Sequence, residues 1–235
     1  MMLGYFTSLL TTTVTGRPET FWMPEQASTV APGVDFTFDV ITWICYFFFA
    51  LVTTLLIVFM VKYRRTSPTM ETRGPTHNLP LELTWTIIPL ILVVVIFVVG
   101  MRGYLDLMEA PEGAYDIQVT AQKWSWTFEH PVYGAIEVGE LTVPVGQPVR
   151  LLMTSKDVLH SLWIPSFRVK MDVVPGRYTS LWFEATKTGD FLLNCTEYCG
   201  KGHSEMSAMV HVVPLDEFDA IMVKQIGRAS CRERV

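Results

Sequence analysis

The stretch Val40–Val61, VITWICYFFFALVTTLLIVFMV, decides the fold, because its 22 residues include no charged side chain. A second uncharged stretch, Leu83–Met101, reads LTWTIIPLILVVVIFVVGM and is 19 residues long. A helix needs about 20 apolar residues to cross the hydrocarbon core of a bilayer. We therefore predict two transmembrane helices, at about residues 38–62 and 82–102, and expect Pro89 to bend the second one.

The loop between the two predicted helices carries more basic than acidic side chains. Two acidic residues accompany four basic ones, which are Lys62, Arg64, Arg65 and Arg73. Basic residues accumulate in the cytoplasmic loops of membrane proteins. We therefore interpret residues 36–102 as a hairpin that crosses a bacterial inner membrane twice. Residues 1–35 and 103–224 are then an N-terminal outer segment and a domain in the periplasm or an equivalent compartment.

After the second apolar stretch, residues 103–224 consist of short runs rich in Val, Thr and aromatic side chains, which are separated by turns that contain Gly and Pro. The pattern predicts strands at Tyr115–Ala121, Trp124–Glu129, Val149–Thr154, Tyr178–Ala185, Asp190–Asn194 and Ser207–Val213. A short terminal helix is expected at Asp216–Lys224. Evenly spaced short strands are typical of a β-sandwich or a Greek-key barrel, so the predicted fold is a helical hairpin followed by an all-β domain.

The C-terminal tail has two interpretations, a genuine basic tail or a segment foreign to the natural protein, and we favour the second. The stretch IGRASCRERV, residues 226–235, matches the translation of a common sequencing adapter. We therefore interpret residues 225–235 as foreign to the natural protein, so Cys231 is not a candidate ligand.

The chain is acidic overall, with 23 Asp and Glu against 18 Lys and Arg and a formal net charge of −5 at pH 7. An acidic surface attracts basic protein partners and accelerates their encounter. The same charge argues against nucleic-acid binding, which requires a basic surface.

The sharpest motif is CTEYCGKGHSEM, residues 195–206, where two thiols, an imidazole and a thioether occur within one short loop. A further imidazole, His160, lies upstream near the end of another predicted strand. Sulfur and imidazole ligands together suit copper, zinc or iron–sulfur chemistry. The thioether of Met206 favours copper, because methionine is a familiar weak ligand of copper in blue-copper sites.

The number of available ligands favours two copper ions over one. One Cys, two His and one Met would suffice for a single copper. With the second Cys, the thiolates of Cys195 and Cys199 can bridge two coppers, while His160 and His203 supply one imidazole to each. The thioether of Met206 and the main-chain carbonyl of Glu197 remain as weak ligands.

Two simpler interpretations of the loop stay open. Cys195 and Cys199 could form a disulfide, since the compartment is oxidising, although that leaves His203 and Met206 without a role. A structural zinc site would use two Cys and two His, but the spacing is atypical and the thioether is then unused.

Four segments resemble cytochrome c oxidase subunit II. Residues 195–206 resemble the family's CuA loop, and residues 160–177, HSLWIPSFRVKMDVVPGR, resemble its other copper-ligand segment. The WSW of residues 124–126 resembles its aromatic signature, and NLPLELTWTIIP, residues 78–89, resembles the start of its second transmembrane helix. The resemblance implies a cupredoxin-like barrel, a CuA centre with the ligands already named, and oxidase subunits I and III as partners.

The resemblance also implies roles for three individual residues. The carboxylate of Glu197 would hold a magnesium or manganese ion shared with subunit I, since such ions prefer oxygen ligands. Trp124 would accept electrons from docked cytochrome c, although a tryptophan there could simply belong to the core, as we expect for Trp126. Glu82 would admit protons to subunit I, or it could merely be a helix-start residue favoured by the helix dipole.

The expected function is electron entry into cytochrome c oxidase. The copper pair would accept electrons from cytochrome c and pass them to haem in subunit I, where oxygen is reduced to water as protons are translocated. A quinol oxidase subunit II would lack the copper ligands, and the copper domain of nitrous oxide reductase is soluble. The alternative is a membrane-anchored copper- or zinc-binding β-domain without an oxidase role.

Overall fold

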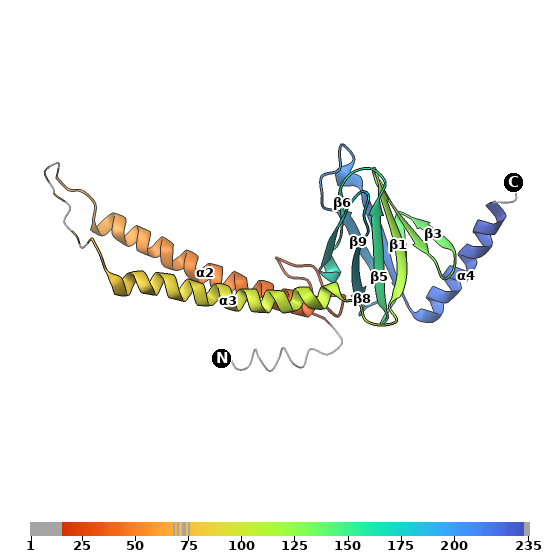
Figure 1. The fold of residues 1–235 in the computed structure, drawn as a ribbon, viewed down its shortest axis with the longest axis horizontal. Coiled ribbons are helices and arrows are strands. Elements are labelled where there is room, and N and C mark those ends of the chain that lie inside the picture. Colours follow the sequence, from red (N-terminus) through yellow and green to blue (C-terminus); the bar gives the residue numbers. More distant parts are fainter. Residues whose placement is uncertain (1–15, 68, 70, 72–73, 75, 233–235) are drawn as a thin grey trace. The chain divides into compact units, whose positions relative to one another are not determined.

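The computed structural model describes residues 16–232 except 68, 70, 72–73 and 75 (Figure 1). Arg73 of the basic loop therefore lies outside the described residues, as do residues 1–15 and 233–235. The chain divides into two compact units, of which Asp35–Tyr104 is one and the flanking segments together form the other.

The membrane unit is built on two long helices, α2 (Ala31–Lys62) and α3 (Leu79–Met108). Each is long enough to cross a membrane and includes an 18-residue window of mean hydropathy 2.7. Both helices extend beyond the predicted spans of 38–62 and 82–102. Hydropathy marks only the apolar part of a helix, whereas capping side chains fix where it begins.

Capping is visible at the start of both helices. Ser28 Oγ accepts the N–H of Ala31 at 3.2 Å, and Asn78 Oδ1 accepts the N–H of Leu81 at 3.2 Å. Pro89 lies inside α3, where it removes one main-chain donor.

Two five-stranded sheets form the β domain (Figure 1). The first has the order β3-β2-β1-β5-β8 and the second the order β4-β10-β9-β6-β7. The strands are β1 (Tyr115–Gln122), β2 (Ser125–His130), β3 (Ala135–Val138), β4 (Glu140–Pro144), β5 (Pro148–Ser155), β6 (His160–Ile164), β7 (Val169–Val173), β8 (Thr179–Glu184), β9 (Gly189–Cys195) and β10 (Ser207–Val213). Two pairs, β1 with β5 and β4 with β10, are parallel.

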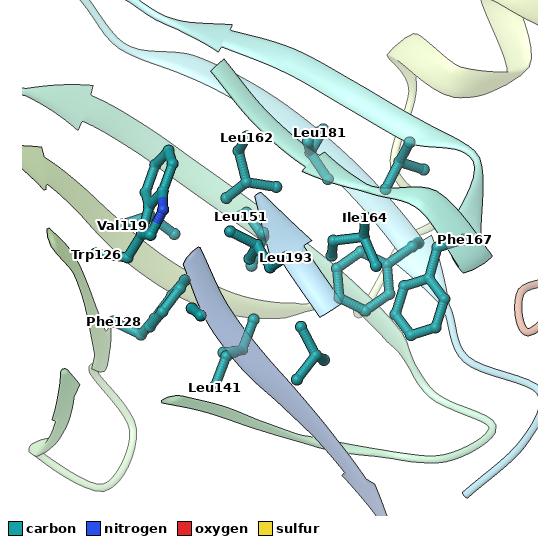
Figure 2. Close-up of a cluster of buried hydrophobic side chains, with 14 of the residues drawn as sticks. Val119, Trp126, Phe128, Leu141, Leu151, Leu162, Ile164, Phe167, Leu181 and Leu193 are labelled. Atoms are coloured by element: carbon teal, nitrogen blue, oxygen red, sulfur yellow. The ribbon is translucent and has the colours of Figure 1, made fainter. Parts of the chain in front are cut away.

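The core of the β domain consists of alternate side chains from both sheets (Figure 2). Its largest fully buried members include Trp126 and Phe128 of β2, Phe167, and Phe183 of β8. Strands β1 and β5 alternate between buried and more exposed positions, as expected where one face of a sheet covers a core. The predicted fold class, two apolar helices followed by an all-β domain, is confirmed.

All six predicted strands are present within two residues of their predicted bounds, but four strands were missed. Strands β3 and β4 have only four and five residues and flank Gly139, so their alternation is too short to recognise. Strands β6 and β7 form a hairpin around the 3-10 turn η1 (Pro165–Phe167). They were missed because Pro and Ser in this turn are typical of loops. His160 is consequently the first residue of β6 and is separated from the end of β5 by a short loop.

The terminal helix α4 (Leu215–Arg232) is longer than the predicted Asp216–Lys224 and continues into residues 225–232. Its Phe218 and Met222 are buried together with Ala135 of β3. The buried side chains of the helix therefore precede the segment we interpret as foreign, and Gln225 at the start of that segment donates to Glu137 Oε1 at 3.0 Å.

Candidate metal centre

The two thiols of the predicted site lie next to each other without a disulfide. Cys195 is the last residue of β9, and Cys199 lies in the loop that follows. Their Sγ atoms are 3.8 Å apart, whereas a disulfide bond is about 2.05 Å long. Both cysteines are free and buried in this structure, so the structure is that of the dithiol and not of the disulfide alternative.

Strand pairing brings His160 to the thiols across 35 residues of sequence. Strand β6 pairs with β9 in antiparallel register, with Leu162 opposite Cys195. The Nδ1 atom of His160 consequently lies 3.8 Å from Cys195 Sγ. On the other side, His203 begins the 3-10 turn η2 (His203–Glu205), and its Nδ1 lies 3.5 Å from Cys199 Sγ. Each thiol therefore has one imidazole beside it.

The two weak ligands also lie at the thiols. Met206 is buried, and its Sδ is 3.8 Å from Cys199 Sγ. The carbonyl oxygen of Glu197 accepts a hydrogen bond from Cys195 Sγ at 3.3 Å. All six metal ligands predicted from the sequence are thus gathered in one place, and His160, Cys195 and Cys199 offer ligand atoms within 4.8 Å of one another.

This set of donors fits a soft metal cation. Burial and the adjacent Cys195 thiol raise the pKa of Cys199 to about 11, so two thiolates side by side require a cation to stabilise them. Two thiols, two imidazoles and a thioether match copper, since magnesium and calcium prefer oxygen and structural zinc does not use methionine.

Asp157, which was not predicted from the sequence, contacts the predicted ligand His160 at the ring nitrogen that does not face Cys195. Its Oδ1 lies 2.9 Å from His160 Nε2. A carboxylate can only accept, so Nε2 carries the proton and Nδ1 directs its lone pair towards Cys195. Burial would raise the pKa of Asp157, but hydrogen bonds from His160 and from the N–H groups of Lys123 and Val158 lower it to about 2. A carboxylate three residues before a predicted ligand is the signal that could have identified it.

Trp124 packs against the loop of residues 195–206, here called the metal loop. It lies in the turn between β1 and β2 and is 42% exposed. A Cβ atom placed on Gly202 would come within 2.5 Å of the indole, and one on Gly200 within 3.5 Å. Gly202 is therefore required for the close approach of the tryptophan, whereas a Cβ on Gly200 would make an ordinary contact and Gly200 is favoured by its positive φ of 118°. Trp126, by contrast, is fully buried, which confirms its interpretation as a core residue.

Glu82 belongs to the membrane unit and acts there as a helix-start residue. Its Oε1 lies 2.9 Å from His77 Nδ1 and accepts the N–H of Asn78 at 3.2 Å. With the reciprocal bond from Leu81 to Asn78, these contacts form a cap at the start of α3. A proton-entry role remains a prediction.

Comparison with protein families identifies both parts of the chain. Residues 137–213 match the family model for the periplasmic domain of cytochrome c oxidase subunit II, and residues 16–102 match the model for its transmembrane domain. Cytochrome c oxidase subunit 2 of Thermostichus vulcanus is 30% identical, over 84% of this chain and 76% of that protein. The chain belongs to the cytochrome c oxidase subunit II family. The predicted family is thereby confirmed.

Two further similarities are found. Cytochrome c oxidase subunit 2 of Alkalihalophilus pseudofirmus is 34% identical over 72% of this chain, which spans about half (52%) of that relative. The solved periplasmic domain of subunit II of cytochrome oxidase from Bradyrhizobium japonicum is 30% identical and covers 51% of this chain and 99% of that domain, with a TM-score of 0.49.

Membership of the family makes the chain a subunit of an oxidoreductase complex. Helices α2 and α3 fall largely within the match to its transmembrane domain, and β4 to β10 fall within the match to its periplasmic domain. The pattern fits a membrane protein whose C-terminal domain is periplasmic.

Proposed function

We propose that this chain is the electron-entry subunit of a cytochrome c oxidase and that the donors around Cys195 and Cys199 hold a pair of copper ions. When bound, the copper pair supplies a one-electron acceptor for cytochrome c and a donor to haem in subunit I, where oxygen is reduced to water and protons are translocated. The ligands would be His160, Cys195, Cys199, His203 and Met206, together with the Glu197 carbonyl.

One observation carries the proposal, namely that two unbonded thiols lie 3.8 Å apart with an imidazole beside each. A single metal ion would not need both cysteines, both histidines, a thioether and a carbonyl. Because five of these donors belong to residues 195–206 and His160 is held by Asp157, the site is largely pre-formed. A pre-formed site limits the rearrangement that accompanies a change of charge.

The exposed Trp124 supports electron entry at the same edge of the domain. Its indole covers Gly202 of the metal loop and leaves 42% of its surface open to a docked partner. The acidic net charge of the chain favours a basic donor such as cytochrome c.

The remaining parts of the proposal concern the assembled enzyme. The carboxylate of Glu197 would hold a magnesium or manganese ion at the contact with subunit I, and subunit III would complete the complex. Glu82 would admit protons at the cytoplasmic end of α3. We infer that the complex lies in a bacterial inner membrane with the β domain in the periplasm.

Copper loading of the full-length chain in detergent tests the proposal. We expect two coppers per chain, an intense purple colour and an EPR hyperfine pattern from one electron shared by two copper nuclei. Cys199→Ser should abolish all three. Cys45→Ser is the matched control, because Cys45 is an exposed residue of α2 outside the loop, and it should change none of them. One copper per chain, or colourless metal binding by the parent protein, would overturn the proposal.

A further inference from the structure

Two loops of the β domain meet beside the metal ligands because β1 and β5 run parallel. Their register pairs Ala121 with Ser155, so both strands end at the same edge of the sheet. The Lys156 N–H donates to the carbonyl of Ala121 at 3.0 Å, which joins the loop after β5 to the end of β1. Trp124 lies just beyond the end of β1, and His160 lies just beyond the loop after β5.

The carboxylate of Asp157 connects these two loops with one oxygen to each. Its Oδ1 accepts from His160 Nε2 at 2.9 Å, and its Oδ2 accepts from the main-chain N–H of Lys123 at 2.8 Å. Its Oδ1 also accepts the N–H of Val158 at 2.7 Å, which fixes the carboxylate within its own loop. The side chain is 29% exposed, so these bonds are only partly accessible to competing water.

We propose that Asp157 is a positioning residue that couples the metal ligand His160 to the electron-entry residue Trp124. The inference rests on the proposed function and deepens it. Through Oδ1 the carboxylate keeps the proton of His160 on Nε2 and orients the ring, so that Nδ1 remains free for metal. Through Oδ2 it fixes the main chain of Lys123, the residue before Trp124. The indole of Trp124 in turn lies against Gly202 of the metal loop.

The geometry demands a carboxylate and not merely a polar side chain. The two donors, His160 Nε2–H and Lys123 N–H, approach different oxygens of the same group. An amide has only one acceptor oxygen, so Asp157→Asn must leave one of the two donors facing an NH2 group. Asp157→Ala removes both acceptors. The two variants therefore lose the connection to different degrees in a fold that is otherwise unchanged.

A second Asp–His pair in the same domain provides the matched control. Asp190 Oδ1 lies 2.7 Å from His211 Nδ1, between neighbouring strands β9 and β10. Asp190 is near the start of β9, whereas Cys195 is at its end. Asp190→Asn therefore removes a comparable aspartate–histidine contact without touching the ligands or Trp124.

The experiment uses the full-length chain in detergent, first without metal and then with copper. In the metal-free protein, NMR of the histidine ring nitrogens and of the tryptophan indole N–H groups reports on both ends of the connection. We expect His160 to be protonated on Nε2 in the parent. In Asp157→Ala, His160 should populate both tautomers and the Trp124 indole signal should shift. Asp157→Asn keeps one acceptor oxygen, so it should change at least one of the two signals. Asp190→Asn should change neither signal.

In the copper-loaded protein we expect the Asp157 variants to bind copper about 10- to 100-fold more weakly, a loss typical of removing the hydrogen-bond partner of a histidine ligand. Their reduction potential should also differ from that of the parent. The inference is overturned if His160 keeps its tautomer and the Trp124 signal stays in place in both Asp157 variants. Failure of the parent to bind two coppers contradicts the proposed function, whereas the metal-free signals test the coupling separately.

Discussion

Replacing Gly202 with alanine should push the Trp124 indole away from the metal loop. An ideal Cβ at this position would lie 2.5 Å from Cδ2 of the indole and 2.8 Å from both Cγ and Cε3. Ordinary carbon–carbon contacts are about 3.5–4.0 Å, so the indole or the loop must move by about 1 Å. Backbone strain adds nothing, because Gly202 has φ −91° and ψ 16°, which alanine readily adopts.

The magnitude follows from two opposing effects on the free energy of unfolding. Overpacking at a tight contact costs about 1–3 kcal/mol. Replacing glycine with alanine at a compatible position reduces the conformational entropy of the unfolded chain and stabilises the folded protein by about 0.4–1 kcal/mol. The net loss is about 1–2 kcal/mol, which corresponds to a fall in Tm of roughly 2–8 °C for a protein of this size.

A double-mutant cycle isolates the contact between the two side chains. The full-length chain in detergent is heated while its near-ultraviolet circular dichroism is recorded. In a Trp124→Ala background the obstacle is gone, so Gly202→Ala should be neutral or slightly stabilising. If Gly202→Ala lowers Tm equally in both backgrounds, the loss arises elsewhere and the inferred contact with Trp124 is refuted.

Three further predictions follow from individual side chains. Met206→Leu should cost less than about 1.5 kcal/mol of stability while shifting the reduction potential of the copper-loaded protein; an unchanged potential would show that the thioether is not a ligand. Burial of Glu137 would raise its pKa, but hydrogen bonds from His130 and Thr142 lower the pKa overall. The ionised carboxylate therefore stabilises the fold at every pH above the ordinary pKa of Glu. This stabilisation is lost as the pH falls through the lowered pKa. Glu137→Gln should therefore flatten the dependence of Tm on acidic pH and cost about 1.5–3 kcal/mol at neutral pH, whereas Glu140→Gln, on an exposed side chain, should do neither. In the assembled oxidase, Glu82→Ala should slow turnover and proton uptake, whereas Asn78→Ala, which removes only a cap of the same helix, should not; equal effects would reduce Glu82 to its capping role.

The sequence by itself determined the features that depend on neighbouring residues. Two uncharged stretches are enough to define two apolar helices, because a helix satisfies its own main-chain hydrogen bonds. Cys195, Glu197, Cys199, His203 and Met206 lie on a single loop, so the spacing alone indicated a metal site with sulfur ligands.

Only the tertiary structure decided what depends on pairing between distant strands. His160 reaches Cys195 because β6 pairs with β9, although β6 itself was missed in the sequence. Asp157 joins His160 to the main chain before Trp124 because β1 and β5 end at the same edge. Strand register is set by the packing of the whole core and not by the local pattern, so neither contact could be deduced from spacing. The metal loop that the sequence identified is thus completed by residues that only the fold brings to it.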